Sequence, residues 1–398
     1  METKWKKIDK GDVAFFVVLT ITALLIVRWI FGSNITEYNT SICAINYTNG
    51  FMPAGFLGTV LLMCNKFAGG ILMNYQGIFA LNLVVMFLYV ALLLLVSITA
   101  YLRTGNRGSV TAKQIICFAS IFGFSMFCGG ATFAGTGVYQ MILVLIAMEL
   151  FLCEKAEWLV MILSVIGICI QPDFFFLNLG MMLFPLAYKM KASQHRNYYK
   201  ILFGMTLGTS IGMFAYSEYM TRFHLNMTAD SQVSLMQQLS NNPNKFDVGN
   251  ADFVFRNLSA LLQDWDYAGS NYIELVRYII FSLPFLVMFV KLLMGLRSRF
   301  TSYVPFILGM LLFLPQFLLK VHYGVIVYHF IMYVLLMVLL IYALCDEVMT
   351  EEVEKRKMSL KAKFPLPVLF LVYAMCFVPF ADISVSENIR ALISYFIG

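Results

Sequence analysis

The sequence predicts an all-α fold: a polytopic integral membrane bundle of about eleven transmembrane helices, with amphipathic helices on its outer surface. Hydrophobic residues make up 60% of the 398-residue chain and charged residues only 13%, about half the charged share of a soluble protein. The apolar residues form long runs between polar segments, and the basic residues gather in alternate polar segments. One globular core cannot bury this much apolar surface. We therefore expect a single membrane domain over residues 1–398.

The apolar runs are the expected spans. The third to sixth runs are shorter than the roughly 20 residues of a full crossing, so we expect packed hairpins there, or spans that borrow residues from their loops. In chain order the runs cover residues 13–31, 78–101, 115–130, 138–151, 159–170, 174–188, 201–218, 272–293, 303–319, 325–344 and 365–381.

The basic residues orient these spans. With the N-terminus in the cytoplasm, 20 of the 28 lysines and arginines fall on the cytoplasmic side, as the positive-inside rule requires. The net charge of +6 therefore indicates orientation among membrane lipids, and not binding of nucleic acid. We expect a multi-pass protein of the cell membrane with a cytoplasmic N-terminus and, after eleven spans, an outer C-terminus.

The first outer loop, residues 32–77, contains the apolar stretch "FMPAGFLGTVLLMC" over residues 51–64. As a helix this stretch is about 21 Å long, too short for a hydrocarbon core of roughly 30 Å. Gly69 and Gly70 then give a turn signal. We expect an interfacial or re-entrant helix that does not cross. Its predicted apolar face consists of Phe56, Leu57, Val60, Leu61 and Cys64.

The long outer loop, residues 219–271, contains "DFVFRNLSALLQDWDY" over residues 252–267. Apolar residues at helical spacing, with Asp252 as a candidate N-cap, predict a second surface helix. Both a substrate-facing role and an ordinary loop that covers the spans are compatible with this pattern.

The stretch "GFMPAGFLG" at residues 50–58, together with two surface helices over many spans, resembles the GT-C type of membrane glycosyltransferase. It is also similar to the "GF..RG..G" stretch of bacterial envelope-polysaccharide membrane proteins, with Ala54 in place of the arginine. The resemblance covers about residues 1–100 by motif and the rest only by layout. It implies transfer of a sugar from a polyprenyl-phosphate carrier at the outer leaflet to a glycan or lipid acceptor.

An enzyme of this type needs a base that activates the acceptor hydroxyl and cations that hold the phosphate leaving group. The candidate bases are the outer carboxylates Glu37 and Asp173, and each could equally be a solvated loop residue. For His329, a hydrogen bond between helices is the alternative to substrate binding. The candidate substrate-binding residues are Arg222, Arg256, Lys320, His322 and His329.

No definite cofactor follows from the sequence. A divalent metal ion held by His322, His329 and Asp173 is an alternative, but no spacing fixes a third ligand. Two other functions also stay open: an O-antigen-type polymerase or ligase that uses the long loop, and a lipid-linked-glycan transporter or non-catalytic envelope protein. Apart from His329, the charged residues gather at span ends, which favours chemistry at the surface over transport.

Overall fold

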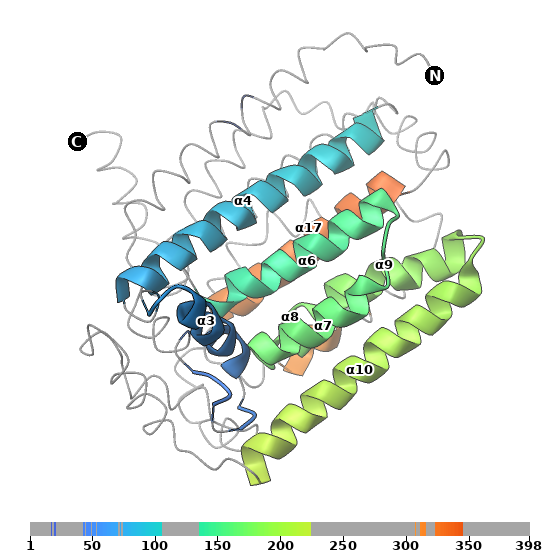
Figure 1. The fold of residues 1–398 in the computed structure, drawn as a ribbon. Helices are drawn as coiled ribbons and strands as arrows, with labels where there is room; N and C mark the ends of the chain where they lie inside the picture. The colour runs from blue at the N-terminus through green and yellow to red at the C-terminus, as the bar shows by residue number, and fades with distance from the viewer. Residues whose placement is uncertain are drawn as a thin grey trace.

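The computed structural model describes residues 45–48, 50–52, 54–70, 72, 75–105, 135–223, 311–315 and 323–344, and the single positions 17, 20, 43 and 307. These residues form helices joined by turns and short connections, and they contain no strand. The predicted all-α class is confirmed for this part of the chain. The elements, shown in Figure 1, are α3 (Gly55–Phe67), α4 (Tyr75–Gly105), α6 (Thr136–Cys153), α7 (Leu159–Ile170), α8 (Phe174–Leu177), α9 (Leu179–Ala192), α10 (Arg196–Phe223) and α17 (Tyr323–Leu344).

The helices follow the predicted apolar runs closely. Helices α4, α6, α7, α10 and α17 begin and end within a few residues of the runs at 78–101, 138–151, 159–170, 201–218 and 325–344. The run at 174–188 is divided at Asn178 into the single turn α8 and the helix α9. Helix α7 ends at Ile170 because Gln171, which precedes Pro172, has an extended backbone, as residues before proline prefer.

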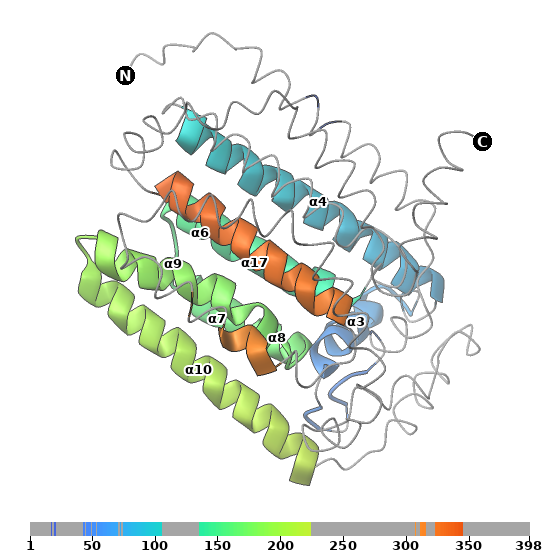
Figure 2. The ribbon, with the colours of Figure 1, turned by 180° about the vertical axis from the view of Figure 1, so that it is seen from behind.

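The long helices lie side by side with their axes roughly aligned (Figures 1 and 2). Helix α6 packs between α4 and α7, α10 packs on α7 and α9, and α17 packs on α4 and α9. One end of the molecule, here named the α3 end, carries α3, α8 and the start of α4. The opposite end, named the turn end, carries the α6–α7 turn (residues 154–158) and the α9–α10 turn (residues 193–195).

Two of the described helices are long and apolar enough to cross a membrane, over Gln76–Arg103 and Thr136–Cys153. Helix α3, helix α7 and the Leu179–Met190 part of α9 are apolar but shorter. The predicted spans at 13–31, 115–130, 272–293, 303–319 and 365–381, and most of the long outer loop, lie wholly or largely outside the described residues. The total of about eleven spans therefore stays a prediction.

Helix α3 packs on the rest of the molecule through its glycine side. Gly55, Gly58 and Leu61 are buried, whereas Val60 is 43% exposed and Cys64 is exposed. The reason is a close backbone approach, because a Cβ atom on Gly58 would lie 1.9 Å from the carbonyl oxygen of Ile45. Val60 and Cys64 of the predicted apolar face therefore point outward, and the interfacial position of this helix stays a prediction.

The predicted turn after this helix is confirmed. Helix α3 ends at Phe67, and Gly69 and Gly70 have φ angles of 68° and 90°, which glycine adopts without strain. The Gly70 N–H donates to the carbonyl oxygen of Asn65 at 2.9 Å.

Replacing Gly58 by alanine is expected to destabilise the protein by about 1–3 kcal/mol, because the new methyl group must displace the backbone at Ile45. Gly208→Ala in α10 is the matched control, since an added Cβ there meets nothing within 4 Å. Alanine favours a helix over glycine by about 1 kcal/mol, so this control should be neutral or stabilising. Thermal unfolding of the detergent-solubilised chain measures both, and equal melting temperatures would contradict the packing of α3.

Candidate functional site

The polar side chains of the α3 end gather around Asp173, which lies in the connection between α7 and α8. The Gln140 Nε2 atom donates to Asp173 Oδ1 at 3.0 Å and to the carbonyl oxygen of Gln171 at 3.1 Å. Gln140 belongs to the apolar helix α6 and is buried, whereas Asp173 is half-buried. A buried amide from one helix thus holds a carboxylate at the end of another.

Asn178 fixes the orientation of this amide. Its Nδ2 atom donates to Gln140 Oε1 at 3.0 Å, so the Gln140 Nε2 atom faces Asp173. The Asn178 Oδ1 atom is itself buried, with no hydrogen-bond partner among the described residues, and a buried acceptor left in this state is costly. The Thr136 hydroxyl donates to Gln171 Oε1. We name this group the Asp173 cluster: Thr136, Gln140, Gln171, Asp173 and Asn178.

The first outer loop packs beside the cluster. The Tyr47 hydroxyl donates to the carbonyl oxygen of Cys169, in the last turn of α7, at 3.4 Å. The Tyr47 ring stacks on Phe51 with centroids 5.3 Å apart, and Phe51 contacts the ring of Tyr216 in α10 at 5.0 Å. Burial raises the pKa of Tyr47 above its ordinary value, so its hydroxyl stays a donor. The loop therefore joins α7 to α10 at the α3 end.

A second buried polar group connects the first outer loop to α4 and α6. The Tyr139 hydroxyl donates to Asn82 Oδ1 at 2.7 Å, and both side chains interact with the thiol of Cys43. Burial raises the pKa of the Cys43 thiol to about 11, although these two hydrogen bonds lower it. A thiol with this pKa is protonated at neutral pH and is a poor nucleophile. We assign this group to packing of the loop.

Of the predicted base candidates, Asp173 lies in the cluster and Glu37 lies outside the described residues. Arg256, Lys320 and His322 lie outside the described residues as well. Arg222 belongs to the last turn of α10, and its side chain is outside the description. The phosphate-binding set therefore stays a prediction.

His329 is buried within α17, a helix that packs against α4, α6, α8 and α9. Tyr333, one turn further on, is also buried, and its ring centroid lies 5.5 Å from that of Phe313. Among the described residues, no three His, Cys, Asp or Glu side chains lie together as metal ligands would. His322, needed for the predicted metal alternative, is not one of these residues.

The sequence reasoning missed four members of the cluster, because Thr136, Gln140, Gln171 and Asn178 carry no charge. An amide residue within or beside an apolar run could have predicted such a member. Buried amides in apolar helices are usually hydrogen-bonded to a neighbouring helix. Gln140 in the run at 138–151 gives this signal.

No known protein family, curated protein or solved structure matches the chain. The chemistry of the Asp173 cluster therefore follows only from its own side chains. It combines one carboxylate, held by an amide donor, with amide and hydroxyl groups that both donate and accept hydrogen bonds. Such a set can bind a neutral ligand rich in hydroxyl groups. The Asp173 carboxylate can accept a proton from one of those hydroxyl groups.

Proposed function

We propose that the chain is a multi-pass membrane protein that transfers a sugar from a polyprenyl-phosphate carrier at the outer face of the cell membrane. Its product would be a cell-surface polysaccharide or glycolipid. The observation that carries the proposal is the Asp173 cluster, a group of polar side chains with a carboxylate at one end of an apolar helical bundle.

The surface of α4 supports placement in a membrane. This helix is apolar over its whole length, yet large apolar side chains face outward, with Val84 and Leu102 each 64% exposed. A soluble monomer rarely exposes a continuous apolar stripe of this kind, whereas lipid covers it favourably. The bias of basic residues toward alternate loops then places the turn end in the cytoplasm and the α3 end outside.

The groups at the α3 end support a sugar as the ligand. Sugar hydroxyls both donate and accept hydrogen bonds, and the half-buried Asp173 carboxylate can accept them. Asp173 accepts a hydrogen bond from Gln140, which holds the carboxylate in a fixed position, as a general base requires. We assign the base to Asp173, with Glu37 as the alternative, and the phosphate contacts to Arg222, Arg256, Lys320 and His322, with His329 deeper in the site.

The experiment is a comparison of cell-surface glycans between cells that produce the chain and cells that lack it. The proposal expects one sugar to be missing from the glycan when the chain is missing, with its polyprenyl-phosphate donor accumulating in the membrane. Shorter glycans of unchanged composition would instead indicate a polymerase or ligase. Unchanged glycans and an unchanged donor pool would show that the chain is not this transferase.

A further inference from the structure

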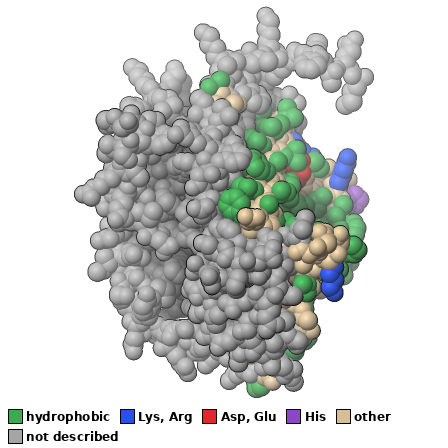
Figure 3. Space-filling model, turned by 60° about the vertical axis from the view of Figure 1, so that its left-hand side comes forward, with side chains coloured by type: hydrophobic (Ala, Val, Ile, Leu, Met, Phe, Trp, Pro, Cys, Tyr) green, Lys and Arg blue, Asp and Glu red, His purple; other side chains and the backbone are tan. Residues whose placement is uncertain are grey.

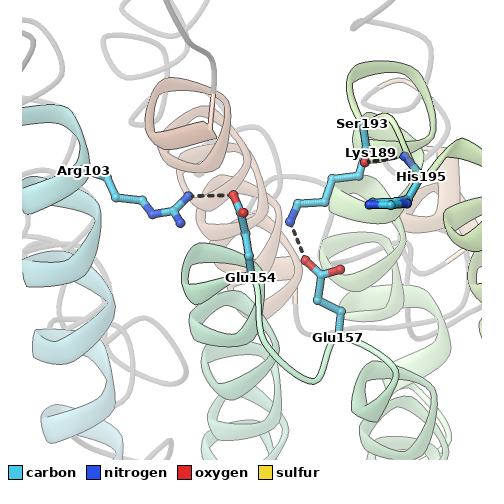
Figure 4. A network of polar contacts seen from close by, with 6 residues as sticks. All are labelled: Arg103, Glu154, Glu157, Lys189, Ser193 and His195. Carbon is cyan, nitrogen blue, oxygen red and sulfur yellow. Dashed lines mark hydrogen bonds and ion pairs between the residues drawn. The ribbon is translucent and has the colours of Figure 1, made fainter.

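The turn end is held together by a buried ion pair. Lys189 of α9 binds the carboxylate of Glu157, in the α6–α7 turn, and both side chains are buried (Figure 4). The Lys189 Nζ atom also lies 5.6 Å from the ring centroid of Tyr199 in α10. The pair thus fixes the α6–α7 turn against the helices on either side of the α9–α10 turn.

The other carboxylates near this end are also engaged. Glu154 accepts a hydrogen bond from Arg103 of α4 at 3.2 Å (Figure 4). Glu149, one turn deeper in α6, accepts hydrogen bonds from Thr99 at 2.9 Å and from Cys153 at 3.2 Å. Glu154 and Glu157 of the α6–α7 turn are therefore each paired with a basic side chain, whereas the donors to Glu149 are neutral.

The basic residues that remain at this end face outward. Lys155 in the α6–α7 turn, and Arg196 and Lys200 in the first turns of α10, are exposed, and His195 beside them is exposed as well. We name Lys155, Arg196 and Lys200 the basic face. Figure 3 shows basic side chains and a histidine at the margin of an apolar surface.

Two aromatic side chains stand at the same level. Trp158 is 52% exposed and Tyr198 is 45% exposed. Tryptophan and tyrosine are enriched where a membrane meets water, because their rings are apolar and their N–H and O–H groups are polar. Their exposure beside the basic face indicates the depth of lipid headgroups.

We propose that the basic face binds the phosphate headgroups of anionic phospholipids in the inner leaflet. Among the described residues, no acidic side chain forms an ion pair with the basic face. Its positive charge matches that leaflet, and the planar fork of Arg196 suits a phosphate group. The buried Lys189–Glu157 pair fixes the α6–α7 turn, which carries Lys155, against α9, which leads into the turn before Arg196 and Lys200. The inference rests on the proposed membrane placement and is independent of sugar transfer.

The test measures lipid binding to the detergent-solubilised full chain by native mass spectrometry, with phosphatidylglycerol and phosphatidylcholine as the two probes. Phosphatidylglycerol should bind more tightly. The triple variant Lys155→Gln, Arg196→Gln, Lys200→Gln should reduce its affinity about a hundredfold, because each basic residue near an anionic surface contributes about a fivefold factor. The charge-conserving pair Arg196→Lys, Lys200→Arg should retain most of the binding.

Lys66→Gln is the matched control, because Lys66 is exposed on α3 at the opposite end of the molecule, and we expect it to change nothing. Equal affinity for the two lipids, an unchanged triple variant, or an equal loss in Lys66→Gln would each overturn the proposal. No sugar donor is present in this measurement, so a failure of the proposed transferase activity leaves its outcome unaffected.

Discussion

Replacing Lys189 by methionine is expected to lower the free energy of unfolding by about 3–5 kcal/mol, because it leaves the Glu157 carboxylate buried without its counter-ion. The two side chains are only 9% and 6% exposed, so water cannot take the place of the lysine. Methionine keeps much of the apolar stem that packs near Phe151 and Tyr199. The loss should therefore come mainly from the charge. Unfolding of the detergent-solubilised chain by denaturant measures it.

The matched control is Arg103→Met, which breaks the neighbouring ion pair with Glu154. Those side chains are 32% and 59% exposed, and exposed pairs contribute only about 0.2–1 kcal/mol. The double variant Lys189→Met, Glu157→Gln should recover much of the lost stability, since it removes the buried charge itself. Similar small losses in both single variants would show that the Lys189–Glu157 pair is not shielded from water.

Replacing Asp173 by asparagine is expected to reduce the rate of sugar transfer by about 10²- to 10⁴-fold, the usual contribution of a general base. Asparagine keeps an oxygen that can accept the hydrogen bond from Gln140 Nε2, so folding and membrane insertion should be unchanged. The turnover rate should fall, with less effect on donor binding, because the substitution removes the proton acceptor while retaining the shape of the site. The assay follows transfer of labelled sugar from its polyprenyl-phosphate donor in membranes that contain the variant.

Glu154→Gln is the control for removal of one negative charge, since Glu154 lies at the turn end and pairs with Arg103. Its transfer rate should equal that of the wild type. Glu37→Gln distinguishes the two candidate bases. Loss of activity in Glu37→Gln alone would move the base to the first outer loop, and full activity in both single variants and in the double variant would remove the catalytic assignment.

The positions of the helices could be predicted from the sequence because long apolar runs have few alternatives to a helix. The division of the run at 174–188 was harder to predict, since it depends on the contact between Asn178 and Gln140 of another helix. The side of α3 that packs inward could not be predicted, for a similar reason. Spacing reports which side chains share a face, whereas the approach of Gly58 to Ile45 is a tertiary contact.

The candidate site could be predicted only where a charge marked it. Asp173 is the one charged residue in the short connection at 171–173, so it was singled out from the sequence. The other members of the cluster are uncharged, and the hydrogen bonds that join Gln140 of α6 to Gln171, Asp173 and Asn178 span 31 to 38 residues along the chain. Amides at such separations give no periodic or spaced signal, and only the packing of α6 against α7 brings them together.

The proposed position of the Asp173 cluster at the outer face is tested most directly with two native cysteines. Cys64 on α3 and Cys153 at the end of α6 are both exposed and lie at opposite ends of the molecule. In variants that keep Cys64 or Cys153 as the only cysteine, a membrane-impermeant maleimide is added to intact cells. It should label Cys64 and not Cys153, and both should react after permeabilisation. Labelling of Cys153 in intact cells, with Cys64 protected, would place the Asp173 cluster in the cytoplasm and contradict a site at the outer face.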